Sequence, residues 1–110
     1  MEMILMSKAD VEYDLEHTLR SKDRVFVLFY ASWCPFSRRF LPTFEKFAQD
    51  KTRNCLSVVV DDKASLCERY SVEVYPTVLV FDKGKVVRRL DGALGVGLSE
   101  EQLMSLVSTR

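Results

Sequence analysis

Hydrophobic positions along the chain fall in turn into helical and strand patterns. Val11, Leu15 and Leu19 recur at four-residue spacing, which places them on one face of a helix over about residues 8–21. The next segment, RVFVLFY, is almost unbroken in apolar residues and rich in β-forming ones, which is typical of a central strand covered on both faces. The pattern therefore predicts a helix followed by a buried strand.

A second helical pattern runs from Cys34 to about Gln49. Its apolar face is a stripe of phenylalanines at spacings of four, four and three, namely Phe36, Phe40, Phe44 and Phe47. Such a stripe indicates core packing rather than a cofactor site. Pro42 falls inside this helix, where its ring removes a backbone hydrogen bond and predicts a kink.

The remaining segments predict two further helices and three strands. CLSVVVDD is typical of a second buried strand, and a short helix follows over residues 64–70. PTVLVFDKGKVVRRLDG predicts two strands joined by a tight turn, in which Gly84 supplies a positive φ. A last helix begins at Leu98 or Ser99, with a serine cap and acidic residues in its first turn.

The order of these elements, αβαβαββα, predicts the fold class. Strands separated by helices pair in parallel through right-handed crossovers, and the C-terminal hairpin adds antiparallel strands at an edge. We therefore expect a single α/β domain over residues 1–110, with a mixed central sheet between two helix layers.

Charge and composition narrow the function classes. Sixteen acidic and sixteen basic residues leave no net charge, so nothing attracts nucleic acid or an anionic membrane at long range. No apolar run approaches the roughly 20 residues of a membrane span. The opening MEMILM is too short for a signal peptide core and lacks a basic start, so we expect a cytoplasmic protein. We expect a monomer as the default state of a domain of this kind.

Three cysteines, Cys34, Cys55 and Cys67, leave at least one thiol free. The single histidine, His17, lies far from any of them and no two cysteines are close in sequence, which argues against a zinc site. We expect neither a metal nor a cofactor. Cys55 and Cys67 are expected to be small buried residues away from the site, with a resolving or regulatory role as the alternative.

Three segments, FYASWCPFS, VYPTVLVFDKGK and DGAL, resemble the thioredoxin family, as does Pro42 eight residues after Cys34. The resemblance covers nearly the whole chain and implies a thioredoxin fold. It also implies that Pro76 is cis and that the backbone before it binds an extended peptide beside Cys34. A trans proline opening a strand is the alternative.

The same resemblance suggests an apolar landing surface for that peptide. Trp33 and Tyr75 flank the cysteine and the proline, and Pro35 and Phe36 are expected to join them in binding the substrate. Ordinary core packing is the alternative for Trp33 and Tyr75.

Two positions depart from the family pattern. Ser37 stands where the family has its second, resolving cysteine, which makes the motif CxxS. Leu28 stands where thioredoxin has a buried aspartate and protein disulfide isomerases a glutamate. Those carboxylates assist proton transfer at the second thiol, so both losses are consistent with a single-thiol site.

The helix start favours a reactive thiol at Cys34. Unpaired N–H groups and the positive end of the helix dipole stabilise a thiolate, which is the nucleophile, and Pro35 at the first helical position loses no hydrogen bond. We expect this sulfur to be ionised and accessible. Ser37, one turn later, can donate a hydrogen bond to the sulfur but cannot resolve a mixed disulfide.

These residues predict a thiol-disulfide oxidoreductase that acts through Cys34 alone, on protein disulfides or glutathione mixed disulfides, in redox homeostasis. Release then needs the substrate's second thiol, glutathione or another small thiol. One alternative is a redox-silent peptide-binding module. Another is a laboratory trapping variant of a dithiol thioredoxin, although Leu28 is a second departure that one deliberate change does not explain.

Overall fold

The computed structural model describes residues 8–50, 52–61, 64–93 and 96–108. The observed element order confirms the predicted αβαβαββα arrangement. In chain order the elements are α1 (Lys8–Ser21), β1 (Arg24–Tyr30), α2 (Pro35–Phe47), β2 (Cys55–Val59), α3 (Ala64–Arg69), β3 (Thr77–Asp82), β4 (Lys85–Asp91) and α4 (Glu100–Ser108).

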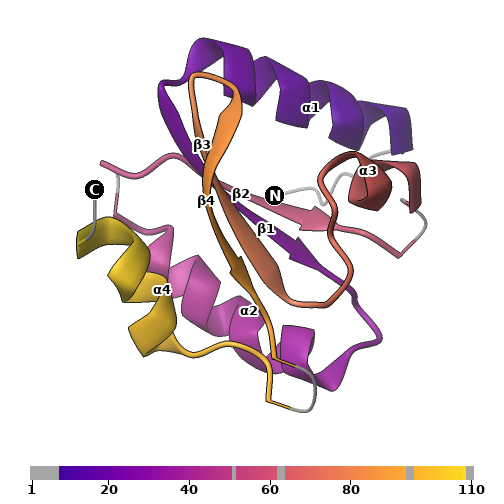
Figure 1. The fold of residues 1–110 in the computed structure, drawn as a ribbon, viewed down its shortest axis with the longest axis vertical. Coiled ribbons are helices and arrows are strands. Elements are labelled where there is room, and N and C mark those ends of the chain that lie inside the picture. The colour runs from indigo at the N-terminus through magenta and orange to yellow at the C-terminus, as the bar shows by residue number, and fades with distance from the viewer. Residues whose placement is uncertain (1–7, 51, 62–63, 94–95, 109–110) are drawn as a thin grey trace, which may run out of the picture.

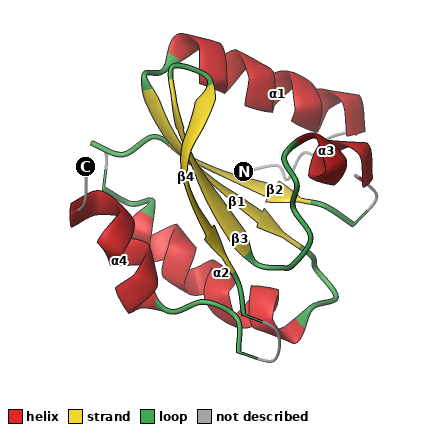
Figure 2. Ribbon diagram, in the orientation of Figure 1, coloured by secondary structure: helices red, strands yellow, loops and turns green. Residues whose placement is uncertain are grey.

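The four strands form one mixed sheet in the order β2-β1-β3-β4. β1 and β2 are parallel, whereas β3 is antiparallel to both β1 and β4. α1 and α3 cover one face of the sheet, and α2 and α4 cover the other (Figure 1, Figure 2). This is the three-layer α/β/α thioredoxin fold.

β1 is the central strand that its sequence predicted. Successive side chains of a strand point to opposite faces. Val25, Val27 and Phe29 therefore join the core beneath α1 and α3, while Phe26 and Leu28 join the core beneath α2 and α4. All five side chains are buried, so two hydrophobic clusters meet through this strand.

The C-terminal hairpin lies at an edge of the sheet, as predicted: β4 is the outer strand, and β3 lies between β1 and β4. Residues 77–81 of β3 are all buried, because helices cover both faces of the sheet. β2 differs from expectation: it was expected to be a buried strand, yet it lies at the edge of the sheet that the described residues form, and only Val58 of its residues is buried.

The predicted helix faces and ends are largely as expected. Leu15 and Leu19 are buried on α1, whereas the side chain of Val11 lies outside the described residues. Pro42 lies within α2, on an exposed position. At the start of α4, the Gln102 N–H donates to the Ser99 hydroxyl oxygen at 3.2 Å, which confirms the serine cap.

The β3–β4 turn also matches its sequence. Lys83 and Gly84 both have positive φ, 54° and 84°, as the two central residues of a type I′ turn require. This turn lies at one end of the sheet, next to the end of α1. The Lys83 N–H donates to the Asp23 carbonyl there, at 2.6 Å. The opposite end of the sheet carries the candidate site.

Candidate active site

Three connections meet at the carboxyl end of β1: β1–α2, α3–β3 and β4–α4 (Figure 1). Between them lies a hollow of about 270 Å³. It is lined by Trp33, Cys34, Phe36, Glu73, Val74, Tyr75, Gly92 and Ala93. The structure thus brings Trp33, Cys34, Phe36 and Tyr75 together, as predicted from separate stretches of sequence.

Cys34 is the residue that caps the amino end of α2. Its carbonyl accepts the Arg38 N–H at 3.0 Å, while its side chain makes no capping hydrogen bond. The sulfur instead points toward the Tyr75 carbonyl oxygen, 3.9 Å away. Only 7% of Cys34 is exposed, because it packs into the core beneath α1 and α3. The expectation of an openly accessible sulfur was therefore wrong, and the hollow is the approach to it.

Aromatic side chains form the wall of the hollow beside this sulfur. Trp33 is 67% exposed, and its ring meets that of Tyr75 edge to face with centroids 6.1 Å apart. Phe36 is half-buried, and the guanidinium of Arg39 lies 5.5 Å from its ring centroid. Pro35 is exposed at the first position of α2 and does not line the hollow.

Gly92, which lines the hollow, packs closely against Pro76, which lies behind it. The Tyr75–Pro76 peptide bond is cis, and Pro76 is buried. Its carbonyl accepts the Gly92 N–H at 2.9 Å. A Cβ at position 92 would lie 2.6 Å from that same oxygen, so only glycine fits. Sequence reasoning noted the DGAL segment but did not assign Gly92 or Ala93 to the site.

Comparison with known proteins identifies the family. The sequence profile of the family described as Thioredoxin matches residues 4–108. This chain belongs to the thioredoxin family. The Mycoplasmoides gallisepticum thioredoxin is 34% identical over 80 residues, which cover 72% of this chain and 80% of that protein.

The thioredoxin family includes longer relatives and solved structures that match this chain. Mus musculus protein disulfide-isomerase A5 is 34% identical over 80 residues, 67% of this chain, and the chain spans only 16% of that protein. Fasciola hepatica thioredoxin superimposes with a TM-score of 0.73 at 27% identity, covering 91% of this chain and 90% of that one. Within the thioredoxin family, the chain is thus similar both to thioredoxins and to protein disulfide-isomerases.

Ser37 and Leu28, the two departures from the thioredoxin pattern, are both fully buried. The Ser37 hydroxyl oxygen accepts the Ala31 N–H at 3.2 Å. Within the described part of the chain, no hydrogen bond joins Ser37 to Cys34, which corrects the predicted contact between them. The reason is geometric: Ser37 lies on the inward face of α2 and pairs with the strand-end backbone instead.

The other two thiols have different surroundings from Cys34, and all three are free. Cys55 starts β2 at the far end of the sheet, and burial raises its pKa to about 11. Cys67 is buried on α3, 3.4 Å from the Tyr75 hydroxyl. Burial and this hydrogen bond raise the pKa of Tyr75 to about 12. Cys67 therefore contacts Tyr75, a residue that lines the hollow at Cys34, although it was expected to lie away from the site.

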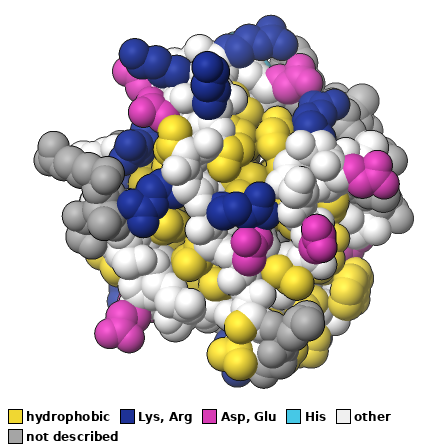
Figure 3. All heavy atoms as spheres, viewed as in Figure 1, with side chains coloured by type: hydrophobic (Ala, Val, Ile, Leu, Met, Phe, Trp, Pro, Cys, Tyr) yellow, Lys and Arg dark blue, Asp and Glu magenta, His cyan; other side chains and the backbone are white. Residues whose placement is uncertain are grey.

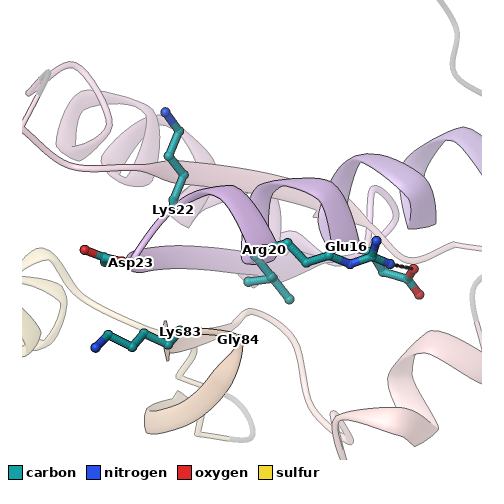
Figure 4. A pocket seen from close by; sticks show the side chains of 7 residues that line it. Glu16, Arg20, Lys22, Asp23, Lys83 and Gly84 are labelled. Carbon is teal, nitrogen blue, oxygen red and sulfur yellow. Dashed lines mark hydrogen bonds and ion pairs between the residues drawn. The ribbon is translucent and has the colours of Figure 1, made fainter.

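A larger hollow, of about 560 Å³, lies at the opposite end of the molecule from the hollow at Cys34. It sits between the end of α1 and the β3–β4 turn, and Figure 4 shows Lys22 and Lys83 pointing away from its centre. Its Arg20 pairs with Glu16 at 3.2 Å. This hollow contains no thiol among its lining residues.

Two features are absent from the described residues. No group of three or more His, Cys, Asp and Glu side chains is placed to hold a metal ion. Among the described helices, none has the length and apolar character needed to cross a membrane. Figure 3 shows basic and acidic side chains interspersed over one face of the molecule.

Proposed function

We propose that this chain is a thiol-disulfide oxidoreductase that acts through Cys34 alone, on protein disulfides and on mixed disulfides with glutathione. One observation carries the proposal. Cys34 lines a hollow of about 270 Å³ at the start of α2, while a buried serine, hydrogen-bonded to Ala31, occupies the position of the family's second thiol.

The chemistry proceeds in two exchanges. The Cys34 thiolate attacks one sulfur of a substrate disulfide, forms a mixed disulfide and expels the other sulfur as a thiolate. An external thiolate, from glutathione or from the substrate's second cysteine, then attacks the mixed disulfide. That step regenerates the Cys34 thiolate and leaves the new disulfide on the released partner.

The positions of the other thiols support release by an external thiol. Cys55 lies at the far end of the sheet. The sulfurs of Cys34 and Cys67 contact opposite ends of one residue, the carbonyl and the hydroxyl of Tyr75. Neither Cys55 nor Cys67 is bonded to Cys34.

A second candidate function is a peptide-binding module that makes no use of the thiol. The 7% exposure of Cys34 favours it, because a buried sulfur reacts slowly unless the bound substrate reaches into the hollow. The residues that line the hollow would bind a peptide equally well in both functions.

Turnover of a glutathionylated peptide, with glutathione as reductant, tests the proposal. We expect Cys34→Ser to lose this activity and Cys55→Ser, the same change at the far end of the sheet, to keep it. Peptide binding without turnover would favour the binding module.

A further inference from the structure

A second hollow adjoins the hollow at Cys34 and follows the α3–β3 connection. It measures about 480 Å³ and is lined by Ser71, Glu73, Val74, Arg89, Asp91 and Gly92. Glu73, Val74 and Gly92 also line the hollow at Cys34. An extended peptide that passes Val74 and Gly92 on leaving the thiol therefore enters this second hollow beside Glu73.

The other two charged residues of the second hollow compensate each other. Arg89 donates from Nε and Nη2 to the carboxylate of Asp91, at 3.0 and 2.9 Å. Two more of its donors reach the carbonyls of Tyr70 at 3.2 Å and Ser71 at 2.9 Å. Arg89 thus uses four of its five N–H donors within the protein and ties β4 to the α3–β3 connection.

Glu73 has no such partner. It is exposed, and no ion pair or hydrogen bond joins its carboxylate to another described residue. Arg89 attracts Glu73, but that guanidinium is already hydrogen-bonded to Asp91, which raises the pKa of Arg89 more strongly than Glu73 does. On the other side of the groove, Arg39 donates to the Val96 carbonyl at 2.6 Å and lines neither hollow.

The described residues that line the two joined hollows therefore carry one net negative charge, close to a thiol: Glu73 and Asp91 are acidic, and Arg89 is basic. We infer that Glu73 makes this groove selective for disulfide-bearing peptides with a basic side chain close to their cysteine. The inference rests on the proposed function and names the substrate class of the same site. Opposite charges at a binding rim act mainly on the association rate and on the choice of partner.

A set of activated peptides tests this selectivity. Each peptide carries one cysteine as a mixed disulfide with 2-thiopyridine, and a single Lys, Gln or Glu at one of three positions on either side. The Cys34 thiolate joins the peptide sulfur and expels pyridine-2-thiolate, whose thione form is followed by its ultraviolet absorbance. The Cys34→Ser protein gives the background from the other two thiols.

We expect the best-placed Lys peptide to react about threefold faster than its Gln counterpart at low ionic strength, as suits an exposed ion pair. The Lys-to-Gln ratio should fall to about one in Glu73→Gln and below one in Glu73→Lys. It should also fall to about one in 1 M salt, where the screening length is about 3 Å. Glu68→Gln removes a carboxylate that lines neither hollow and should keep the ratio.

Binding of the same peptides with serine in place of cysteine separates this inference from the proposed function. Trp33 is the only tryptophan of the chain and lines the hollow, so its fluorescence reports binding without thiol chemistry. No Cys34-dependent exchange, with tighter binding of Lys peptides, overturns the proposed function alone. Equal binding and equal exchange of Lys, Gln and Glu peptides, or a preference unchanged in Glu73→Gln, overturns the role of Glu73.

Discussion

The two ends of the sheet are both hollowed, but in different ways. The hollow between the end of α1 and the β3–β4 turn is twice the volume, about 560 against 270 Å³, and is lined mainly by charged residues. The smaller hollow is lined by a thiol, by two aromatic rings in edge-to-face contact and by a close-packed glycine. Convergent chemistry within an apolar surface, rather than volume, marks the site.

The same contrast holds for the glycines of the two ends. Gly84 serves a turn and needs its positive φ, yet a Cβ there would meet nothing closer than the Leu19 carbonyl at 4.0 Å. Gly92 serves packing, since its Cβ would collide with the Pro76 carbonyl. One end is therefore shaped by backbone conformation and the other by close approach of two segments.

Alanine at these glycines should give the largest effects. We expect Gly92→Ala to destabilise the fold by about 2 kcal/mol, because backbone must shift to relieve the clash, and to slow exchange of peptide disulfides. Gly84→Ala should cost about 1 kcal/mol of left-handed strain and exchange peptides at the wild-type rate. Urea unfolding and the pyridyl-disulfide assay measure both. Wild-type exchange by a stable Gly92→Ala protein would contradict the packing described at Pro76.

Removing the exposed ring at the thiol end should affect binding rather than stability. We expect Trp33→Ala to weaken peptide binding about tenfold, as for an aromatic anchor, while the free energy of unfolding changes by less than about 0.5 kcal/mol. Isothermal titration calorimetry with a serine-containing peptide measures the first quantity. Val87→Ala, which truncates a 48% exposed side chain on β4, is the control and should leave binding unchanged.

A substitution at Ser37 tests whether the residue in place of the family's second cysteine has a structural role. Ser37→Ala leaves the buried Ala31 N–H without its acceptor, which should cost about 1 to 2 kcal/mol. Ser57→Ala, at an exposed position on β2, is the matched control and should be neutral within about 0.5 kcal/mol. Equal unfolding midpoints for the two variants would mean that water replaces the Ser37 hydroxyl.

Alkaline pH should affect both ends of the sheet modestly. Cys55 at the far end and Tyr75 at the site have pKa values raised to about 11 and about 12, so folding favours their neutral forms. That stabilisation is complete below their unfolded-state values of 9.0 and 10.0 and is lost as pH rises to about 12. Each share is about 1 kcal/mol or less, because both groups are partly exposed.

Urea midpoints measured between pH 7 and pH 12 check this dependence. The Cys55→Ala protein should lose less stability than the wild type above pH 9, and Tyr75→Phe should lose less above pH 10. Lysine titration acts equally on all three proteins and cancels in the differences. Parallel curves for the three proteins would contradict the assignment.

Much of the fold could be predicted because its signals are local. The unbroken apolar run of β1, the phenylalanine stripe of α2, the Lys83–Gly84 turn and the Ser99 cap each depend on neighbours in sequence. The edge position of β2 among the described strands could not be predicted in this way. Pairing between strands is a long-range choice, and the apolar pattern of this segment does not say whether the strand lies in the centre of the sheet or at its edge.

The site divides along the same line. Trp33, Cys34, Phe36 and Tyr75 could be named from the family resemblance, and they do line one hollow. The inward turn of the Cys34 sulfur, the contact of Cys67 with Tyr75 and the pairing of Ser37 with Ala31 depend on side-chain packing between distant segments. Glu73 is an exposed acid in a connection, and no pattern in the sequence distinguishes it from other surface acids.

The fate of the mixed disulfide on Cys34 is the most direct test of single-thiol exchange. Intact-mass spectrometry follows the protein loaded with a peptide through Cys34, with and without added glutathione. We predict that the adduct persists alone and decays at a rate proportional to glutathione concentration, whereas the Ser37→Cys protein releases the peptide unaided. Wild-type release without added thiol, leaving a chain lighter by two hydrogens, would contradict the account, because an internal cysteine would then have completed the exchange.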